Sequence, residues 1–124
     1  MVSAVESHDD RMLARNDTGH TRADFERALA LTRRHGLVLR TTFVPFTPWT
    51  TLDQIADLVD VLAAQDLVGC VDPVQLSVRL LVPPGSLLLG PETRDAFGEL
   101  DHAALSYQWK HRDPQVDQLQ KEIA

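Results

Sequence analysis

Cysteine, basic residues and long apolar runs are all scarce in this sequence. Cys70 is the only cysteine, so the chain forms no internal disulfide, as is typical of proteins from a reducing compartment. The 12 Lys and Arg are outnumbered by 18 Asp and Glu, and the resulting formal net charge of −6 disfavours binding to nucleic acid. No apolar run approaches the roughly 20 residues that span a bilayer, and the first ten residues, MVSAVESHDD, lack the basic and apolar regions of a signal peptide. We therefore expect a soluble, cytoplasmic protein that binds neither nucleic acid nor membranes.

What is present is the composition of one folded domain. The chain has 124 residues, of which 44% are apolar and 24% are charged, close to the averages for globular proteins. A chain of this size buries one core. It begins almost inside an apolar run and ends within a helical pattern, so we expect both ends to be cut rather than finished.

Apolar patterning predicts alternating strands and helices over the first two thirds of the chain. Short runs rich in apolar and β-branched residues predict strands at 1–7, 37–44 and 73–82. Helical periodicity is found between them, at 21–36 and 51–65. Three strands separated by helices are typical of parallel strands with right-handed crossovers, so the predicted class is α/β.

Capping signals predict where the first two helices begin and where the first one ends. Thr21 with Asp24, and Thr51 with Gln54, have the spacing of a capping box. Gly36 is expected to stop the first helix.

A further helix is predicted near the end of the chain. Asp113 is a good N-cap residue, and Pro114 suits the first helical position. One helical face carries Val116, Leu119, Gln120 and Ile123. Since the stretch from 83 to 100 is rich in Pro and Gly and weakly periodic, we divide the chain into a unit at 1–90 and a C-terminal extension at 91–124.

The connector FVPFTPWTT, residues 43–51, is unusually rich in aromatic and hydroxyl side chains. It follows a predicted parallel strand, at the end where α/β barrels place their sites, so Phe46, Trp49 and the threonines are candidates for a cavity wall. The alternative is that Trp49 packs the loop onto the next helix while Thr50 and Thr51 cap that helix. The residues leave both possibilities open.

Other residue types that often mark sites have simpler interpretations here. The histidines show no spacing of the zinc type, and we expect them on the surface or at helix ends; they are His8, His20, His35, His102 and His111. Cys70 lies between small and apolar residues, which favours a partly buried, unreactive thiol.

Four stretches together carry a resemblance to a known family: residues 2–37, 40–52, 71–86 and 105–123. In this order they resemble the second half of the barrel of a radical S-adenosylmethionine enzyme. The likeness is greatest to a bacterial group whose members carry a cysteine or selenocysteine tail. The resemblance implies a partial (β/α) barrel of about three parallel strands with helices on one face, plus a C-terminal helix.

The resemblance also implies a cofactor system that this chain contains only in part. Members of the family hold a [4Fe-4S] cluster on a Cys-x3-Cys-x2-Cys loop, and the cluster cleaves S-adenosylmethionine to a 5′-deoxyadenosyl radical. No such loop is present in this sequence. We therefore expect the chain to bind neither group by itself and to have no metal ligands or catalytic residues of its own.

Three residues are carried over from the family as candidate cofactor contacts. Glu6 and Ser7 match a Glu-Ser pair that closes a mid-barrel strand and faces the methionine and ribose of the cofactor. Thr18 stands where relatives tend to have lysine, so any role of that lysine is lost. Arg79 lies on the polar face of the third predicted strand, and a cofactor carboxylate, a substrate anion or a structural ion pair would each satisfy it.

These observations support three functional hypotheses. The chain is a fragment or degenerate copy of a radical S-adenosylmethionine enzyme, inactive alone. Alternatively, it is an accessory half that docks with a separate cluster-bearing chain. A weaker alternative is a small α/β enzyme of another class, which requires a closed pocket with convergent ionisable groups. The expected partner is a cluster-bearing chain or a second copy, and the radical's substrate is not encoded in these residues.

Overall fold

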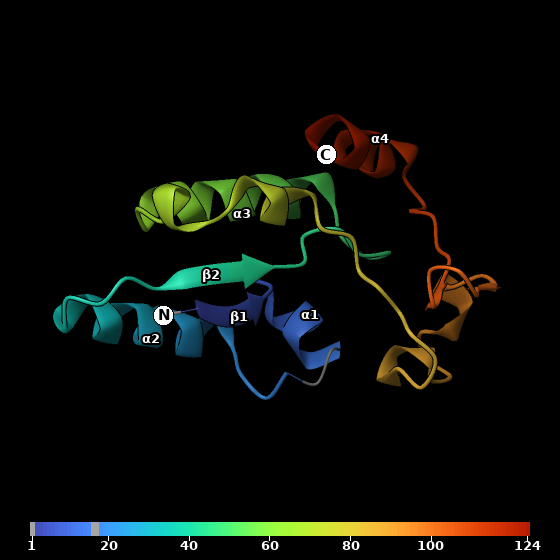
Figure 1. Ribbon diagram of the computed structural model, residues 1–124, viewed down its shortest axis with the longest axis horizontal. Coiled ribbons are helices and arrows are strands. Elements are labelled where there is room, and N and C mark those ends of the chain that lie inside the picture. The colour runs from blue at the N-terminus through green and yellow to red at the C-terminus, as the bar shows by residue number, and fades with distance from the viewer. Residues whose placement is uncertain (1, 16–17) are drawn as a thin grey trace.

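The computed structural model describes residues 2–15 and 18–124, which form a mixed α/β arrangement of four α-helices and two small two-stranded sheets (Figure 1). The elements are β1 (Val2–Glu6), α1 (Asp10–Arg15), α2 (Arg22–Arg34), β2 (Arg40–Phe43), α3 (Leu52–Ala64), β3 (Leu100–Asp101), β4 (Ser106–Tyr107) and α4 (Pro114–Ile123). No barrel is closed within these residues. None of the described helices has the length and apolar character needed to cross a membrane.

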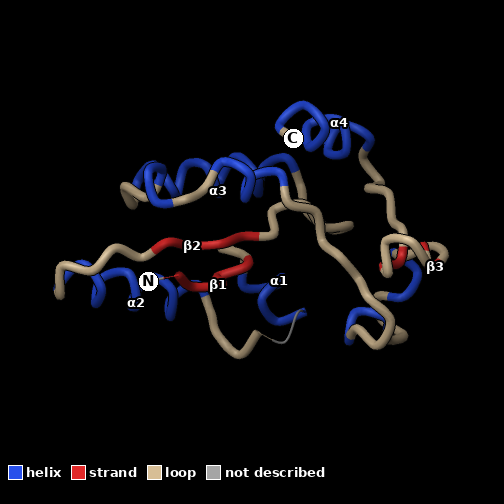
Figure 2. Tube along the Cα trace, viewed as in Figure 1, coloured by secondary structure: helices blue, strands red, loops and turns tan. Residues whose placement is uncertain are grey.

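The strands β1 and β2 run parallel, as the β-α-β pattern predicts (Figure 2). Their register is interrupted by a bulge between Ala4 and Glu6. Beyond β2 the parallel pattern continues in one isolated bridge, which joins Phe46 to Arg79. The backbone N–H of Phe46 donates to the carbonyl of Val78 at 3.2 Å, and that of Leu80 donates to the carbonyl of Phe46 at 2.8 Å. Three parallel segments therefore follow one another, of which the third is a single bridge.

The helices α2 and α3 cover one face of this sheet. Val5 of β1 and Phe43 of β2 belong to one core cluster with residues of both helices, and the ring of Phe43 meets that of Phe25 edge-on at 6.4 Å. The side chains that alternate with Val5 along β1 are exposed: Val2 retains 70% of its accessible surface, and Ala4 is also exposed. The opposite face of the sheet is thus uncovered.

The C-terminal helix α4 packs against the N-terminal end of α3. Val116 is 1% exposed and forms a second core cluster with Phe46 and Ile55. Leu119 packs against the same cluster, and the Gln120 amide donates to the carbonyl of Ser77. The predicted apolar face of α4 is confirmed over these positions, which attach the end of the chain to the edge of the sheet.

The predicted helix boundaries are confirmed. Both capping boxes form, with Thr21 accepting from the N–H of Asp24 and Thr51 accepting from that of Gln54. Gly36 follows α2 in the left-handed region at φ 70°, which glycine adopts without steric cost.

The strand predicted at 73–82 is wrong for most of its length. Residues Pro73–Ser77 form a short 3-10 helix, because Asp72 caps it by accepting from the N–H of Val74 and Pro73 occupies its first position. The alternation of Gln75 and Ser77 with apolar neighbours therefore does not place them on a strand face. Only Arg79, at the isolated bridge, lies in parallel pairing.

Two further predictions need correction in the first half of the chain. The strand predicted at 37–44 is shorter, because β2 begins at Arg40 and Leu37 and Val38 are more than half exposed. The stretch between β1 and α2, where the sequence pattern predicts neither helix nor strand, contains the helix α1. Its residues Met12 and Leu13 are buried, and Asp9 accepts from the N–H of Arg11 at its start.

Candidate functional site

A groove lies at the carboxyl ends of the parallel segments, the edge at which open α/β sheets bind ligands. Glu6, at the end of β1, and Arg79, at the isolated bridge, both line it. Its volume is about 400 Å³, and most of the other lining side chains are apolar: Val44, Val78, Leu80, Leu81, Leu87 and Leu88. The structure therefore brings together two of the three residues singled out as cofactor contacts.

Glu6 has a backbone conformation that residues other than glycine rarely adopt. Its φ is 67°, in the left-handed region, and it forms one side of the bulge between β1 and β2. The N–H of Val44 donates to its carbonyl at 2.7 Å, which fixes the turn. Strained residues of this kind cluster at binding sites, where the surrounding structure holds them. No ion pair involves the carboxylate of Glu6 within the described part of the chain.

Arg79 is held by groups on the C-terminal segment. Its guanidinium donates to the carboxylate of Asp117 at 2.8 Å and to the carbonyl of Trp109 at 3.1 Å, and it lies 3.9 Å from the centroid of the Trp109 ring. Burial of Asp117 opposes its ionisation, but hydrogen bonds from Arg79 and from the His111 N–H outweigh burial and lower the pKa of Asp117. A cofactor carboxylate, a substrate anion and a structural ion pair were the expected alternatives for Arg79, and the structure contains the ion pair, with Asp117.

Ser7 lies apart from this groove. Its hydroxyl accepts from the N–H of Asp9 at 3.0 Å, which starts the turn into α1. Ser7 instead lines a smaller hollow between the end of β2 and the start of α3, with Phe43 and Gln54 among the other lining residues.

The connector after β2 is a tightly packed corner. Phe46 is fully buried in the second core cluster, so it does not wall an open cavity. Trp49 meets Phe97 edge-on at 5.8 Å, which means that it packs on the C-terminal segment and not on the next helix. Thr51 caps α3 as predicted, whereas Thr50 does not.

Two buried hydroxyls hold the corner in shape. The Thr50 hydroxyl donates to the carbonyl of Pro45 at 2.8 Å and accepts from the N–H of Thr47 at 3.0 Å. The Thr47 hydroxyl lies 2.8 Å from that of Thr50 and accepts from the N–H of Trp49. This network explains why the connector is rich in threonine: the hydroxyls satisfy buried backbone groups that no sheet or helix pairs.

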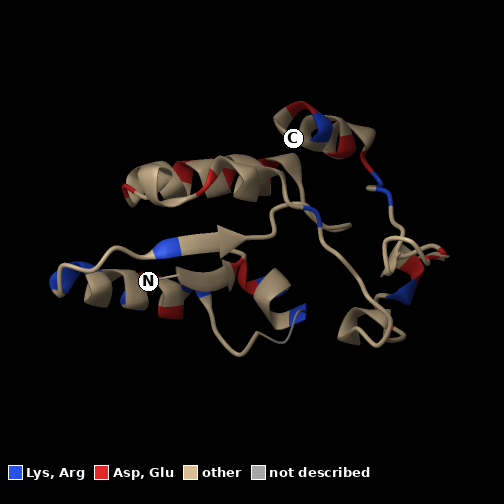
Figure 3. Ribbon diagram, in the orientation of Figure 1, with Lys and Arg blue, Asp and Glu red and all other residues tan. Residues whose placement is uncertain are grey.

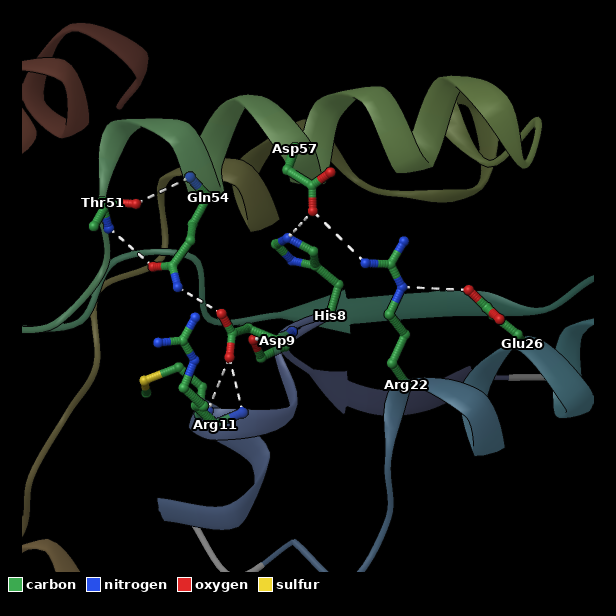
Figure 4. Close-up of polar contacts among 10 residues, drawn as sticks. His8, Asp9, Arg11, Arg22, Glu26, Thr51, Gln54 and Asp57 are labelled. Atoms are coloured by element: carbon green, nitrogen blue, oxygen red, sulfur yellow. Dashed lines mark hydrogen bonds and ion pairs between the residues drawn. The ribbon is translucent and has the colours of Figure 1, made fainter.

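A polar network that the sequence did not reveal lies beside the end of β1 (Figure 4). His8 is only 7% exposed, and its Nε2 lies 2.9 Å from the carboxylate of Asp57 on α3. Arg22, at the start of α2, approaches the same carboxylate at 3.7 Å. Burial, reinforced by the nearby Arg22 charge, lowers the pKa of His8 despite the opposing effect of Asp57. His8 is therefore not the surface residue that we expected.

Asp9 extends this network to the beginning of α3. One of its carboxylate oxygens accepts from the N–H of Arg11, and the other accepts from the amide of Gln54 (Figure 4). Together with His8 and Asp57, these residues line a polar hollow of about 270 Å³. The network joins the loop after β1 to three helices.

The remaining candidate residues have structural roles. His20 lies 3.1 Å from the Val5 carbonyl through Nε2, and His35 is the C-cap residue of α2. Cys70 is partly buried against the first core cluster, as expected. No group of three or more His, Cys, Asp or Glu side chains that could hold a metal ion is found among the described residues.

Comparison with known proteins gives no relative for this chain, because it matches no protein-family model, no curated protein and no solved structure.

Proposed function

We propose that this chain forms the later part of a radical S-adenosylmethionine barrel and is inactive without a cluster-bearing half. One observation carries the proposal. Glu6, at the end of β1, and Arg79, at the bridge that forms the third parallel segment, line the same groove at the carboxyl edge of the sheet. In barrels of parallel strands this edge is where cofactors and substrates bind.

The uncovered face of the sheet supports the barrel part of the proposal. In a barrel, helices cover the outer face of each strand, and the inner face meets side chains from other strands. Here α2 and α3 cover one face, while Val2 and Ala4 project from the other. In the described residues, β1 pairs only with β2, so its second edge is free to take a further strand. In a completed barrel, side chains from other strands would cover the exposed face, and a further strand would pair with the second edge of β1.

The residues of this chain do not fit an iron-sulfur cluster. Such a cluster is held mainly by cysteine thiolates, and Cys70 is the only cysteine. Cys70 also packs against the core between the sheet and its helices, away from the groove. The proposal therefore assigns the cluster to another polypeptide. It also places the chain in the cytoplasm, because a single cysteine and no internal disulfide are typical of a reducing compartment.

The fit to S-adenosylmethionine is one-sided. When it is bound beside a reduced cluster in the family, this cofactor supplies the 5′-deoxyadenosyl radical. The Glu6 carboxylate lines the groove and offers acceptors for an ammonium or for ribose hydroxyls. The guanidinium of Arg79 is already paired with Asp117, so a cofactor carboxylate must compete for it. We expect weak or undetectable affinity when the chain is alone, because a ligand held from one side stays largely hydrated.

The alternative that this chain is an accessory half rests on the same groove. It differs only in that the cluster-bearing half is a separate chain with which this chain docks. The small-enzyme alternative would rest on the polar hollow beside His8. That hollow, at about 270 Å³, lies below the usual size of a small-molecule site, and the Asp57 side chain is 53% exposed. The size and exposure of this hollow therefore favour the radical-enzyme proposal over a small enzyme of another class.

The proposal is tested with the polypeptide encoded directly upstream, which we expect to contain a Cys-x3-Cys-x2-Cys loop. The two halves are co-purified and reconstituted anaerobically with iron and sulfide. After reduction, the complex should release 5′-deoxyadenosine from S-adenosylmethionine, and Glu6→Gln should weaken cofactor binding in calorimetry. Glu26→Gln, which changes an exposed carboxylate on α2, is the matched control.

The same measurements on the isolated chain should give negative results. We expect no stoichiometric iron or sulfide after reconstitution and no measurable heat on titration with S-adenosylmethionine. Micromolar binding of the cofactor, or a complete cluster on this chain alone, would overturn the proposal of an incomplete barrel.

A further inference from the structure

A cleft separate from the Glu6 groove lies between the connector after β2 and the segment that precedes α4. Its volume is about 680 Å³, within the range of small-molecule sites. Three basic side chains line it, those of Arg15, Lys110 and Arg112, although the whole chain is acidic. None of the three forms an ion pair with a described carboxylate. Figure 3 shows basic residues at the end of α1 and in the segment before α4.

His111 also lines this cleft, between two of the three basic residues in the sequence. The N–H of Asp113 donates to Nδ1 of His111 at 2.9 Å, and the carbonyl of Asp113 lies 3.1 Å from the same nitrogen, so the ring is held at the start of α4. Nε2 is buried and has no partner in the part of the chain that the structure describes. Because this atom is enclosed by protein, a ligand in the cleft contacts the cationic side chains and not Nε2.

The other residues that line the cleft indicate which kind of ligand suits it. Glu92 and Asp95 also line the cleft, and they would repel a ligand that carried negative charge along its whole length. The same carboxylates accept hydrogen bonds from hydroxyl groups. Trp49 contributes an aromatic surface, with the Arg15 guanidinium 4.6 Å from its ring centroid. The lining therefore suits a ligand with one anionic group and several hydroxyls.

We infer that this cleft binds a phosphorylated sugar, with the phosphate between the basic side chains and the hydroxyls toward Glu92 and Asp95. Phosphate accepts several charge-assisted hydrogen bonds at once, which the three cations supply. The inference is independent of the barrel proposal, because it uses other residues and requires neither S-adenosylmethionine nor a cluster.

The test is a titration of the ¹⁵N-labelled full chain with ribose 5-phosphate, followed by NMR. We expect saturable shifts of the Trp49 indole N–H and of the His111 imidazole nitrogens, while the Trp109 indole serves as an internal reference. Inorganic phosphate should bind more weakly, and ribose should not bind. The double variant Lys110→Gln/Arg112→Gln should lose affinity by at least about tenfold, because two charge-assisted contacts are removed.

A matched double variant controls for net charge. Arg33→Gln/Arg34→Gln removes two exposed cations from the last turn of α2 and should leave the affinity unchanged. The double variant Glu92→Gln/Asp95→Asn should reduce the preference for ribose 5-phosphate over inorganic phosphate. Equal binding of these two ligands to the unmodified chain, equal losses in both cation variants, or no shift at Trp49 would each overturn the inference.

Discussion

At the scale of single residues, His8 and Glu6 both show how the end of β1 differs from an ordinary strand end. His8 is buried in contact with Asp57, and Glu6 adopts a left-handed backbone beside it. Each conformation has an energetic consequence that can be measured on the isolated chain.

The burial of His8 predicts that the protein loses stability as the solution is acidified. Its pKa is lowered from 6.5 in the folded state, so the unfolded chain takes up the proton first. The free energy of unfolding should therefore fall as the pH drops below about 6.5, with a slope of at most about 1.4 kcal/mol per pH unit from this one group. Urea unfolding at several pH values measures the slope.

The variant His8→Gln should flatten the pH dependence between pH 7 and 5, because it removes the titrating group. His102 is exposed and provides the control, since His102→Gln should leave the slope unchanged. An unaltered slope in His8→Gln would show that other groups produce the acid sensitivity.

The left-handed backbone of Glu6 predicts an unusual response to glycine. Glycine adopts φ 67° without a steric penalty, so Glu6→Gly should retain or increase stability, by up to about 1 kcal/mol. Glu6→Val should instead cost about 1–3 kcal/mol, because a β-branched side chain is poorly tolerated in this region. Thermal and urea unfolding compare the two variants. A clear destabilisation by glycine would show that the Glu6 side chain makes contacts that hold the bulge.

At the scale of elements, threonine is used in two opposite ways in and after β2. Thr50 satisfies buried backbone groups of the connector, whereas the buried hydroxyl of Thr41 has no partner in the described structure. Replacing either by valine keeps the shape and removes the hydroxyl. The pair therefore separates the effect of the hydroxyl from that of packing.

We expect Thr50→Val to lower the free energy of unfolding by about 1–3 kcal/mol, since it leaves a buried N–H without an acceptor. Thr41→Val should be neutral or stabilising by up to about 1 kcal/mol, because no hydrogen bond is lost and an unpaired polar atom leaves the core. Equilibrium urea unfolding tests both variants. Similar losses in the two would contradict the assignment of the Thr50 network.

Elements with a local signal were predictable, and those that depend on distant packing were not. The capping boxes at Thr21 and Thr51 define helices that match the structure, because both capping partners lie within one turn. The third strand failed because alternation alone does not distinguish a strand from a capped 3-10 turn. The Asp-Pro pair at 72–73 has the same helix N-capping pattern as the Asp-Pro pair that predicted the start of α4. It was not used to predict a helical turn at 73–77.

The same distinction applies to the site. Glu6 and Arg79 were selected by resemblance, and their common groove follows from parallel topology, which places strand ends together. The partnership of His8 with Asp57 was not predictable, because it joins a strand end to a helix far along the chain. The only local signal was the position of Asp57 between the core residues Ile55 and Leu58, which directs it toward the edge of the buried face.

At the scale of the whole molecule, the uncovered sheet face and the free edge of β1 predict association. Exposed strands with apolar side chains pair with other chains unless charge or proline prevents it. Val2, which lies on β1 and is 70% exposed, is not protected in this way. We expect the isolated chain to self-associate with rising concentration in sedimentation velocity experiments.

Charge placed on the strand should reverse this behaviour. Val2→Lys/Ala4→Lys is expected to shift the chain toward monomer, because lysine on an edge strand disfavours pairing. Val59→Lys alters an exposed position on α3 and should leave association unchanged. A wild-type chain that remains monomeric at all concentrations would count against an incomplete barrel.

The composition of the first core cluster has a consequence for how the chain is made on the ribosome. All its buried members lie between Val5 and Val71, so this part can close while later residues are still being synthesised. Arg79 emerges next, but its two partners, Trp109 and Asp117, follow only much later. During that interval a nascent chain has a folded first part and an unpaired cation at its open edge. Another polypeptide with a carboxylate could engage Arg79 at this stage, before Asp117 is available.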